Sequence, residues 1–391
     1  MLLRILKKFK SLFIKPRENY YFPASNNIHS KKALLSYILA PYSYSTKEKC
    51  PPKHANFHAA WEIVEILNSL GYDVTAVEAS NKQFVITEDY DLLIGTLDCI
   101  DRFSPYLPKK CRKVFYALGV YVESRNGEAG ELKRISALEE RTGLNYIPKR
   151  LFPNPESIKR SVEKADHLII TGGQATIETF PSKYSSKSSI CTMPIFPNSL
   201  GNFSVMHSSV NNEFIWFFGY GQVHKGLDLV IEAFTKMPNL TLNIAGTMEA
   251  DFEIIYGKVI SESENIKYHG YLQTDGCEFE SLIKRCRAFV APTVNEGISC
   301  ACVSLIQLGL YPIMSEASGV DIESQNYEQL RSCTVPEIIE AVERVSRMGV
   351  DLLNERVTKN SEQAKDMFSP ERFRSDFCKS IQKAAEYSAL E

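Results

Sequence analysis

The sequence contains no run of eighteen apolar residues, and its N-terminus lacks both a long apolar stretch and a small-residue cleavage site. We therefore expect a cytoplasmic protein, because a spanning helix needs the first feature and a secretory signal needs the other two. An excess of charge of one sign is also missing, since the formal net charge is -2 over 391 residues. Nucleic acid is accordingly not an expected partner.

The ten cysteines include no CxxC pair and no metal-ligand spacing. We predict reduced, mostly buried thiols, because free cysteine behaves as a small apolar residue. Cys300 and Cys302 stand closest together, but side chains two residues apart on a helix point in different directions. Asp89 and Asp91 imitate an Asp-x-Asp metal motif and are interpreted instead as solvating the start of a strand. No metal site is predicted.

A dinucleotide fingerprint is missing as well. The first expected strand is not followed by a G-x-G-x-x-G turn with an acid about twenty residues further on, which argues against an oxidoreductase. A sugar-nucleotide epimerase should place more histidines and acids in its cleft than this sequence offers. No cofactor is predicted.

The chain does begin with a basic amphipathic segment. Within residues 1–17, apolar side chains recur at helical spacing, and six lysines and arginines come without an acid. This pattern is typical of a helix on an anionic membrane, and peripheral contact with the inner membrane face is one expectation. A terminal helix packed on the protein's own core is the alternative, because amphipathicity does not say what covers the apolar face.

Short apolar runs then alternate with helical stretches in two series, separated by a Pro-, Asn- and Ser-rich stretch at 194–212. Such alternation predicts α/β domains with parallel sheets, and the chain length suits two of them. The expected units are an N-terminal segment 1–32, domains at 33–205 and 206–368, and a helix within 371–391 that could return to the first domain.

Ligands gather at the carboxyl ends of parallel strands, so the position of each strand matters. We expect strands at 33–40, 73–78, 91–96, 113–117 and 167–171 in the first domain, and at 214–218, 240–245, 266–269, 288–291 and 311–314 in the second.

Two loops in the second series combine polar or charged residues with a strand-to-helix connection. Gly219, Tyr220 and Gly221 follow a strand, and Lys225 precedes an amphipathic helix, an arrangement that suits a diphosphate. Glu296 stands in a second strand-to-helix loop, where a carboxylate can accept hydrogen bonds from sugar hydroxyls. Each motif alone also has a plainer interpretation, a tight turn for the first and an acid favoured by the helix dipole for the second.

The order and spacing of these pieces from 214 to 321 resemble the donor-binding half of family 4 retaining glycosyltransferases, which have the GT-B fold of two Rossmann-like domains around a cleft. The resemblance implies that Lys225 binds the donor diphosphate and Glu296 contacts the transferred sugar, as the two catalytic residues. The donor-binding set that it implies is Gly219, Tyr220, Gly221, Lys225, Gly246, Glu296, Gly297, Ile298, Ser299 and Ser304.

The sequence departs from the family at two of these positions. Tyr220 stands where relatives usually have an arginine, and Ser304 stands where they have a second glutamate that holds the ribose. A bacterial subgroup that also lacks the second glutamate is similar to this sequence. The departures imply a ribose contact that is weaker, made elsewhere or absent.

The N-terminal half resembles the same subgroup less sharply, through residues 53–56, Glu62, residues 116–119, Arg134 and Arg141. It is expected to bind the acceptor, with His54, Asn56 and Gly119 at the cleft. His54 and Asn56 could instead cap the next helix.

We therefore expect an enzyme that moves a sugar from a nucleotide-sugar donor to a glycan or lipid-linked acceptor, with retention and without a metal. Surface polysaccharide biosynthesis is the expected setting. The alternative is a non-catalytic GT-B subunit that binds a glycan or a partner, suggested by Tyr220 and Ser304.

Overall fold

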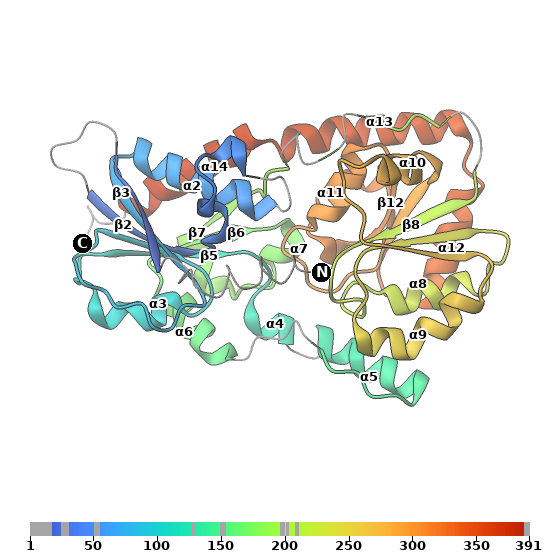
Figure 1. The fold of residues 1–391 in the computed structure, drawn as a ribbon, viewed down its shortest axis with the longest axis horizontal. Helices are drawn as coiled ribbons and strands as arrows, with labels where there is room; N and C mark the ends of the chain where they lie inside the picture. Colours follow the sequence, from blue (N-terminus) through green and yellow to red (C-terminus); the bar gives the residue numbers. More distant parts are fainter. Residues whose placement is uncertain are drawn as a thin grey trace, which may run out of the picture.

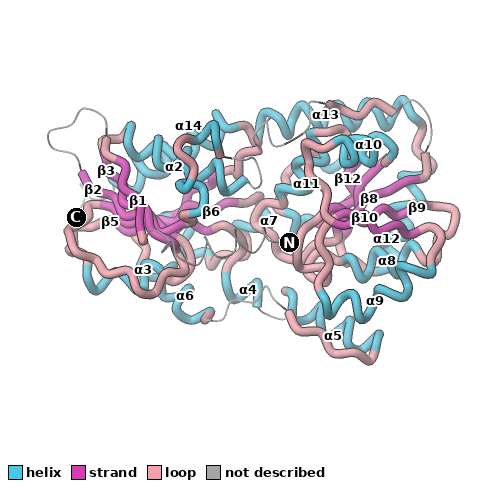
Figure 2. The backbone as a smooth tube through the Cα atoms, viewed as in Figure 1, coloured by secondary structure: helices cyan, strands magenta, loops and turns pink. Residues whose placement is uncertain are grey.

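The computed structural model describes residues 18–24, 31–50, 55–126, 130–148, 154–195, 200, 203–207 and 211–386. The predicted membrane-binding segment 1–17 and His54 lie outside the described residues. Two sheets stand side by side, each with helices on both faces (Figures 1 and 2).

The first sheet has seven strands in the order β1-β3-β2-β4-β5-β6-β7. Its strands pair in parallel except β1, which runs antiparallel to β3. Strand β1 was not predicted; it is a four-residue edge strand rich in aromatic side chains, which favour strands. The strands are β1 (Asn19–Phe22), β2 (Lys31–Tyr37), β3 (Tyr72–Glu78), β4 (Leu92–Gly95), β5 (Arg112–Ala117), β6 (His167–Thr171) and β7 (Ser188–Cys191).

Two hydrophobic clusters cover the two faces of this sheet, which explains why β4 and β6 are buried along their whole length. The helices around it are α2 (Ala55–Ser69), α3 (Cys99–Phe103), α4 (Val122–Asn126), α6 (Pro155–Lys164), α7 (Gln174–Ile177) and α14 (Pro370–Glu386). Short 3-10 turns lie at η1 (Ala40–Ser43), η2 (Lys47–Lys49), η3 (Ser104–Tyr106) and η4 (Ser182–Lys187).

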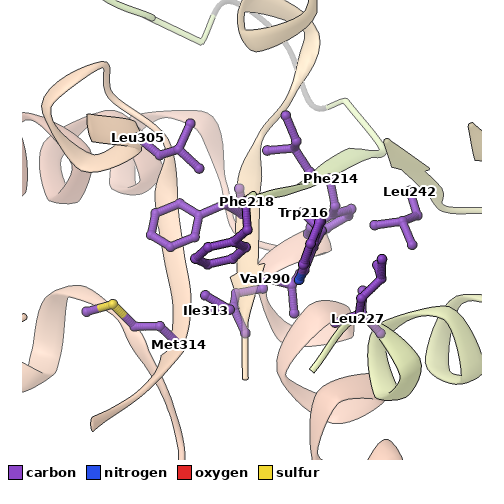
Figure 3. Packing of buried hydrophobic residues seen from close by; sticks show 14 of the residues in the cluster. Phe214, Trp216, Phe218, Leu227, Leu242, Val290, Leu305, Ile313 and Met314 are labelled. Carbon is purple, nitrogen blue, oxygen red and sulfur yellow. The ribbon is translucent and has the colours of Figure 1, made fainter. Parts of the chain in front are cut away.

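The second sheet has six parallel strands in the order β10-β9-β8-β11-β12-β13. Its core contains Trp216, Phe214, Leu242 and Val290 (Figure 3). Its strands are β8 (Glu213–Phe217), β9 (Thr241–Ala245), β10 (Ile266–Gly270), β11 (Ala288–Ala291), β12 (Tyr311–Ser315) and β13 (Glu328–Leu330). Its helices are α8 (Leu227–Phe234), α9 (Ala250–Glu262), α10 (Cys277–Arg285), α11 (Cys300–Gln307), α12 (Val335–Ser346) and α13 (Val350–Met367), with 3-10 turns η6 (Glu316–Ser318) and η7 (Ser324–Asn326).

The chain crosses between the two units more than once. After α13, helix α14 packs on α2 and β7 of the first sheet, and Phe373 and Phe377 enter its core. Arg374 of α14 forms ion pairs with Glu62 and Glu65 of α2. The C-terminal helix therefore completes the first unit.

Helix α5 (Glu131–Thr142) comes from the first half of the sequence but packs on the second unit. It lies within the range predicted for the N-terminal domain, but Ile135, Leu138 and Tyr146 pack into the core of the second sheet. Arg141 of α5 forms an ion pair with the buried Asp228 of α8, with 2.7 Å between Nη2 and Oδ2. The segment from Glu131 to Tyr146 is thus structurally part of the second unit.

Candidate functional site

A cavity of about 640 Å³ lies at the carboxyl ends of β8, β9 and β10, where the second unit meets the first. Eight of the ten predicted donor-binding residues line it, and Asn56 contributes from the first unit. The lining residues from the prediction are Gly219, Tyr220, Lys225, Gly246, Glu296, Ile298, Ser299 and Ser304. Gly221 and Gly297 are not in the lining, although each is next in sequence to a residue that is.

Lys225 and Glu296 meet in this cavity although 71 positions separate them in the sequence. Lys225 Nζ forms an ion pair with Glu296 Oε1 and lies 4.7 Å from the centre of the Phe218 ring. Trp216 Nε1 donates a hydrogen bond to the Lys225 carbonyl at 3.2 Å, which fixes the backbone at that point. A cation and a carboxylate are therefore held together beside the glycine turn.

The loop that carries Glu296 is held in an unusual conformation. Asn295 has a φ of 52°, in the left-handed region that residues other than glycine rarely adopt. The Glu296 N–H donates to the Ala317 carbonyl at 2.8 Å, and the Asn295 side chain donates to the Ser124 carbonyl at 3.0 Å. Strained backbone that neighbours enforce in this way is frequent at functional sites.

The two units touch directly beside the cavity. A Cβ at Gly297 would lie 2.7 Å from Gly119 Cα and 2.7 Å from the Leu118 carbonyl oxygen, so the contact leaves no room for a side chain. The Thr176 hydroxyl donates to the Gly297 carbonyl at 2.8 Å, and Asp321 accepts from the Gln174 N–H at 2.8 Å. The structure thus has the two units closed on each other at the Glu296 loop.

The predicted acceptor residues Asn56 and Gly119 line a second, smaller cavity of about 310 Å³ in the first unit. Asn56 and Leu118 line both cavities, so the two adjoin. Aromatic and aliphatic side chains make up most of the small cavity's wall, including Tyr37, Phe115, Tyr116, Tyr121 and Phe180. Leu97, in the same wall, has a φ of 56°.

A third cavity of about 1250 Å³ lies between α5 and the residues that follow β13. Its charged lining is mixed and includes Lys133, Arg134 and Arg331 as well as Glu232 and Glu316. Among the predicted donor-binding residues only Glu296 lines it. The glycine turn and Lys225 belong to the 640 Å³ cavity, which we therefore take as the candidate site.

Sequence reasoning missed four buried residues behind the cavity: Glu131, Tyr146, His224 and Glu249. His224 directly precedes Lys225, but no pattern gave it a role. Glu131 lies 93 positions earlier, and no local spacing rule could have joined the two. Burial raises the pKa of Tyr146 far above its usual range, and its hydrogen bond to Glu249 adds to this shift.

Other predicted features have structural explanations. Asp91 accepts a hydrogen bond from the Lys32 N–H at 2.9 Å, next to the start of β4. Burial raises the pKa of Cys300 and of Cys302 to about 12, so both are thiols at neutral pH. All ten cysteines are free, as predicted from their scattered spacing.

No group of three or more His, Cys, Asp or Glu side chains in the described part of the chain is placed to hold a metal ion. No described helix has the length and apolarity needed to cross a membrane.

Residues 213–347 match the family model described as "Glycosyl transferases group 1". This match covers the second sheet and its helices up to α12. No curated protein sequence matches the chain.

Solved GT-B structures are similar to most of the chain. A sucrose-phosphate synthase from Thermosynechococcus elongatus has a TM-score of 0.63 at 11% identity, covering 92% of this chain and 100% of that one. HepE from Anabaena, solved with UDP and glucose, has a TM-score of 0.56 at 12% identity, covering 91% and 100%. TarM of S. aureus has a TM-score of 0.54 at 12% identity over 74% of this chain, which spans only 54% of TarM. The predicted GT-B fold is confirmed.

Proposed function

We propose that the protein is a family 4 glycosyltransferase that moves a sugar from a nucleoside-diphosphate sugar to an acceptor hydroxyl, with retention of configuration. The observation that carries the proposal is the meeting of Lys225 and Glu296 in one cavity beside the glycine turn. The group 1 family match to residues 213–347 supports it. UDP is the first nucleotide to test, since HepE was solved with UDP and glucose.

In this proposal the diphosphate replaces Glu296 as the partner of Lys225. Negative charge grows on the diphosphate as its bond to the anomeric carbon breaks, and the Lys225 ammonium and the backbone N–H groups of the glycine turn stabilise that charge. The acceptor hydroxyl oxygen forms the new bond to the anomeric carbon, and the departing diphosphate takes the hydroxyl proton. Glu296, released from Lys225, accepts hydrogen bonds from the sugar hydroxyls and orients the ring. The positive charge comes from protein groups, so the proposed reaction needs no metal.

The acceptor occupies the adjoining 310 Å³ cavity, with Asn56 and Gly119 at its wall. Because Asn56 and Leu118 line both cavities, a hydroxyl at this boundary reaches the sugar. A mostly apolar wall suits an acceptor that carries an apolar group, such as a lipid-linked glycan. The two units are in close contact at Gly297 and Gly119 beside this boundary, and in the proposed reaction this contact limits the access of water. Surface polysaccharide synthesis at the inner membrane face, with residues 1–17 on the lipid, fits this acceptor.

Thermal unfolding with a panel of nucleotide sugars tests the proposal. A true donor at 100 times its Kd adds about 2.7 kcal/mol and raises Tm by several degrees. Lys225→Ala should weaken donor binding by about 10- to 100-fold, because a charge-assisted contact is lost. Lys258→Ala is the matched control, since Lys258 is an exposed lysine of α9 outside the cavity.

The outcomes separate the proposed enzyme from the alternative. A non-catalytic subunit would show stabilisation by glycans and none by any nucleotide or nucleotide sugar. That result, or a Lys225→Ala variant that binds the donor as well as the wild type does, would overturn the proposed function.

A further inference from the structure

The segment from Glu131 to Tyr146 contacts the candidate donor site from behind, although it comes from the N-terminal half of the sequence. Apolar residues of α5 anchor it in the core of the second unit. Arg134 donates to the carbonyl of Pro292, just before the Glu296 loop. The Tyr146 N–H donates to Glu139 Oε1 at 2.9 Å, which ties the end of the segment back to the helix.

The start of this segment reaches Glu296 through one buried histidine. Glu131 Oε2 lies 3.4 Å from His224 Nδ1, and His224 Nε2 lies 3.1 Å from Glu296 Oε1. His224 is fully buried and Glu131 is 1% exposed. Each ring nitrogen of His224 therefore faces a carboxylate at ion-pair distance, although neither contact has hydrogen-bond geometry, so the imidazole ring is packed between Glu131 and Glu296.

The end of the segment reaches the glycine turn through one buried acid. The Tyr146 hydroxyl donates to Glu249 Oε2, and the Gly221 N–H donates to Glu249 Oε1 at 3.1 Å. Gln222 is tied to the same residue, because its Oε1 accepts from the Glu249 N–H at 3.3 Å. Glu249 is 2% exposed and Tyr146 is 3% exposed.

Packing alone does not account for these side chains. A carboxylate taken out of water costs free energy, and an apolar side chain of similar volume often packs in such a place with no loss of stability. Both buried acids face an element that the proposed function assigns to the donor, one toward Glu296 and the other toward the turn at Gly221.

We propose that the segment from Glu131 to Tyr146 is a positioning arm for the donor site. Glu131 orients Glu296 toward the transferred sugar through His224, and Tyr146 holds the diphosphate turn through Glu249. These are positioning residues, because neither contacts the donor itself. The inference rests on the proposed function and adds to it a division of labour between the two ends of the arm.

Calorimetric titration of the full chain with UDP-glucose and with UDP tests the arm. Glu131→Gln should lower the affinity for UDP-glucose relative to UDP by about tenfold while leaving UDP affinity within about twofold. His224→Gln should do the same. Tyr146→Phe should weaken both ligands equally, by about fivefold, because the turn holds the part that they share. Glu140→Gln makes the same change on the exposed side of α5 and should alter neither affinity.

For Glu131→Gln and His224→Gln, the affinity ratio separates positioning from folding, because a variant that is merely less stable loses both ligands alike. For Tyr146→Phe, the stoichiometry of the titration makes this separation, because lost folding lowers the number of binding sites and not the affinity of the sites that remain. If the wild type binds both ligands and Glu131→Gln keeps the wild-type ratio of UDP-glucose affinity to UDP affinity, the proposal of a positioning arm is wrong and the proposed function stands. An equal ratio change in Tyr146→Phe and Glu131→Gln would overturn the division of labour. If the wild type binds neither these ligands nor any other nucleotide sugar and nucleotide from the panel, both the proposed function and the proposed positioning arm are wrong.

Discussion

The carboxyl ends of the two sheets present opposite chemistry on similar architecture. In the second unit, Lys225, Glu296 and the buried Glu249 surround a glycine turn whose backbone is open to a ligand. In the first, side chains such as Leu97 and Leu118 stand at the strand ends and wall an apolar cavity. The difference teaches that the fold supplies two facing sites, while the residues at the strand ends decide which part of a reaction each can hold.

The largest expected effect is a loss of stability when a side chain is added to the tightly packed backbone at the donor cavity. In Gly246→Ala, the new Cβ would lie 1.8 Å from the Phe218 carbonyl oxygen, at a φ of 148° that L side chains rarely adopt. We expect a loss of about 3 kcal/mol or more in the free energy of unfolding, because a backbone atom must move. Urea unfolding measures the loss. Phe218 leads into the glycine turn, so donor affinity should fall as well.

Gly219→Ala is the matched control within the same site. Nothing lies within 4 Å of a Cβ at Gly219, so the substitution should cost less than about 0.5 kcal/mol. Equal stability of the two variants would show that the backbone of this turn does not depend on the close approach at Gly246.

The second expected effect is a loss of stability at acidic pH that arises in the first unit. Burial, with smaller contributions from Lys383 and Lys187, lowers the pKa of His167 on β6 from 6.5 to about 4. The folded chain therefore holds His167 neutral while the unfolded chain binds a proton below about pH 6.5. Its contribution to stability is complete above pH 6.5 and is lost as the pH falls toward 4, by on the order of 2 kcal/mol at pH 5.

His167→Gln isolates this contribution, because burial also lowers the pKa of His58, His207 and His269. The wild type should lose on the order of 2 kcal/mol more than the variant between pH 7 and pH 5. Trp61 of α2 and Trp216 of β8 report the two units by fluorescence during urea unfolding. If the pH dependence of the variant matches that of the wild type, His167 is not the group responsible.

Much of the second unit followed from the sequence because its signals are local. Each strand has a glycine or a polar residue at its end or within the next two positions, and Lys225 and Glu296 each follow such a turn within a few residues. The GT-B fold was predicted correctly from this order. The structure brings Lys225 and Glu296 together as the resemblance implied, while their chemical roles remain predictions.

What the sequence did not reveal depends on contacts between distant residues. Glu131, His224 and Glu296 form one chain of contacts, yet no periodicity relates α5 to the second sheet. Strand β1 was missed because four residues beside a basic segment give too short a pattern. The apolar cavity was also missed, since its wall is assembled from several elements and no motif encodes the space between them.

The smallest expected effect tests whether the two sites are separable. Ser80 is exposed and lies at the wall of the apolar cavity, so Ser80→Trp should fill its mouth at little cost in stability. Octyl glucoside, as an acceptor analogue with an apolar tail, should bind about tenfold more weakly to this variant, because burial of the tail is lost. UDP-glucose should bind as it does to the wild type, since Ser80 does not line the donor cavity. Ser80→Ala should leave both ligands unchanged. The two cavities share Asn56 and Leu118 but not Ser80. A Ser80→Trp variant that no longer binds UDP-glucose, or that still binds octyl glucoside as the wild type does, would therefore contradict the assignment of the apolar cavity to the acceptor.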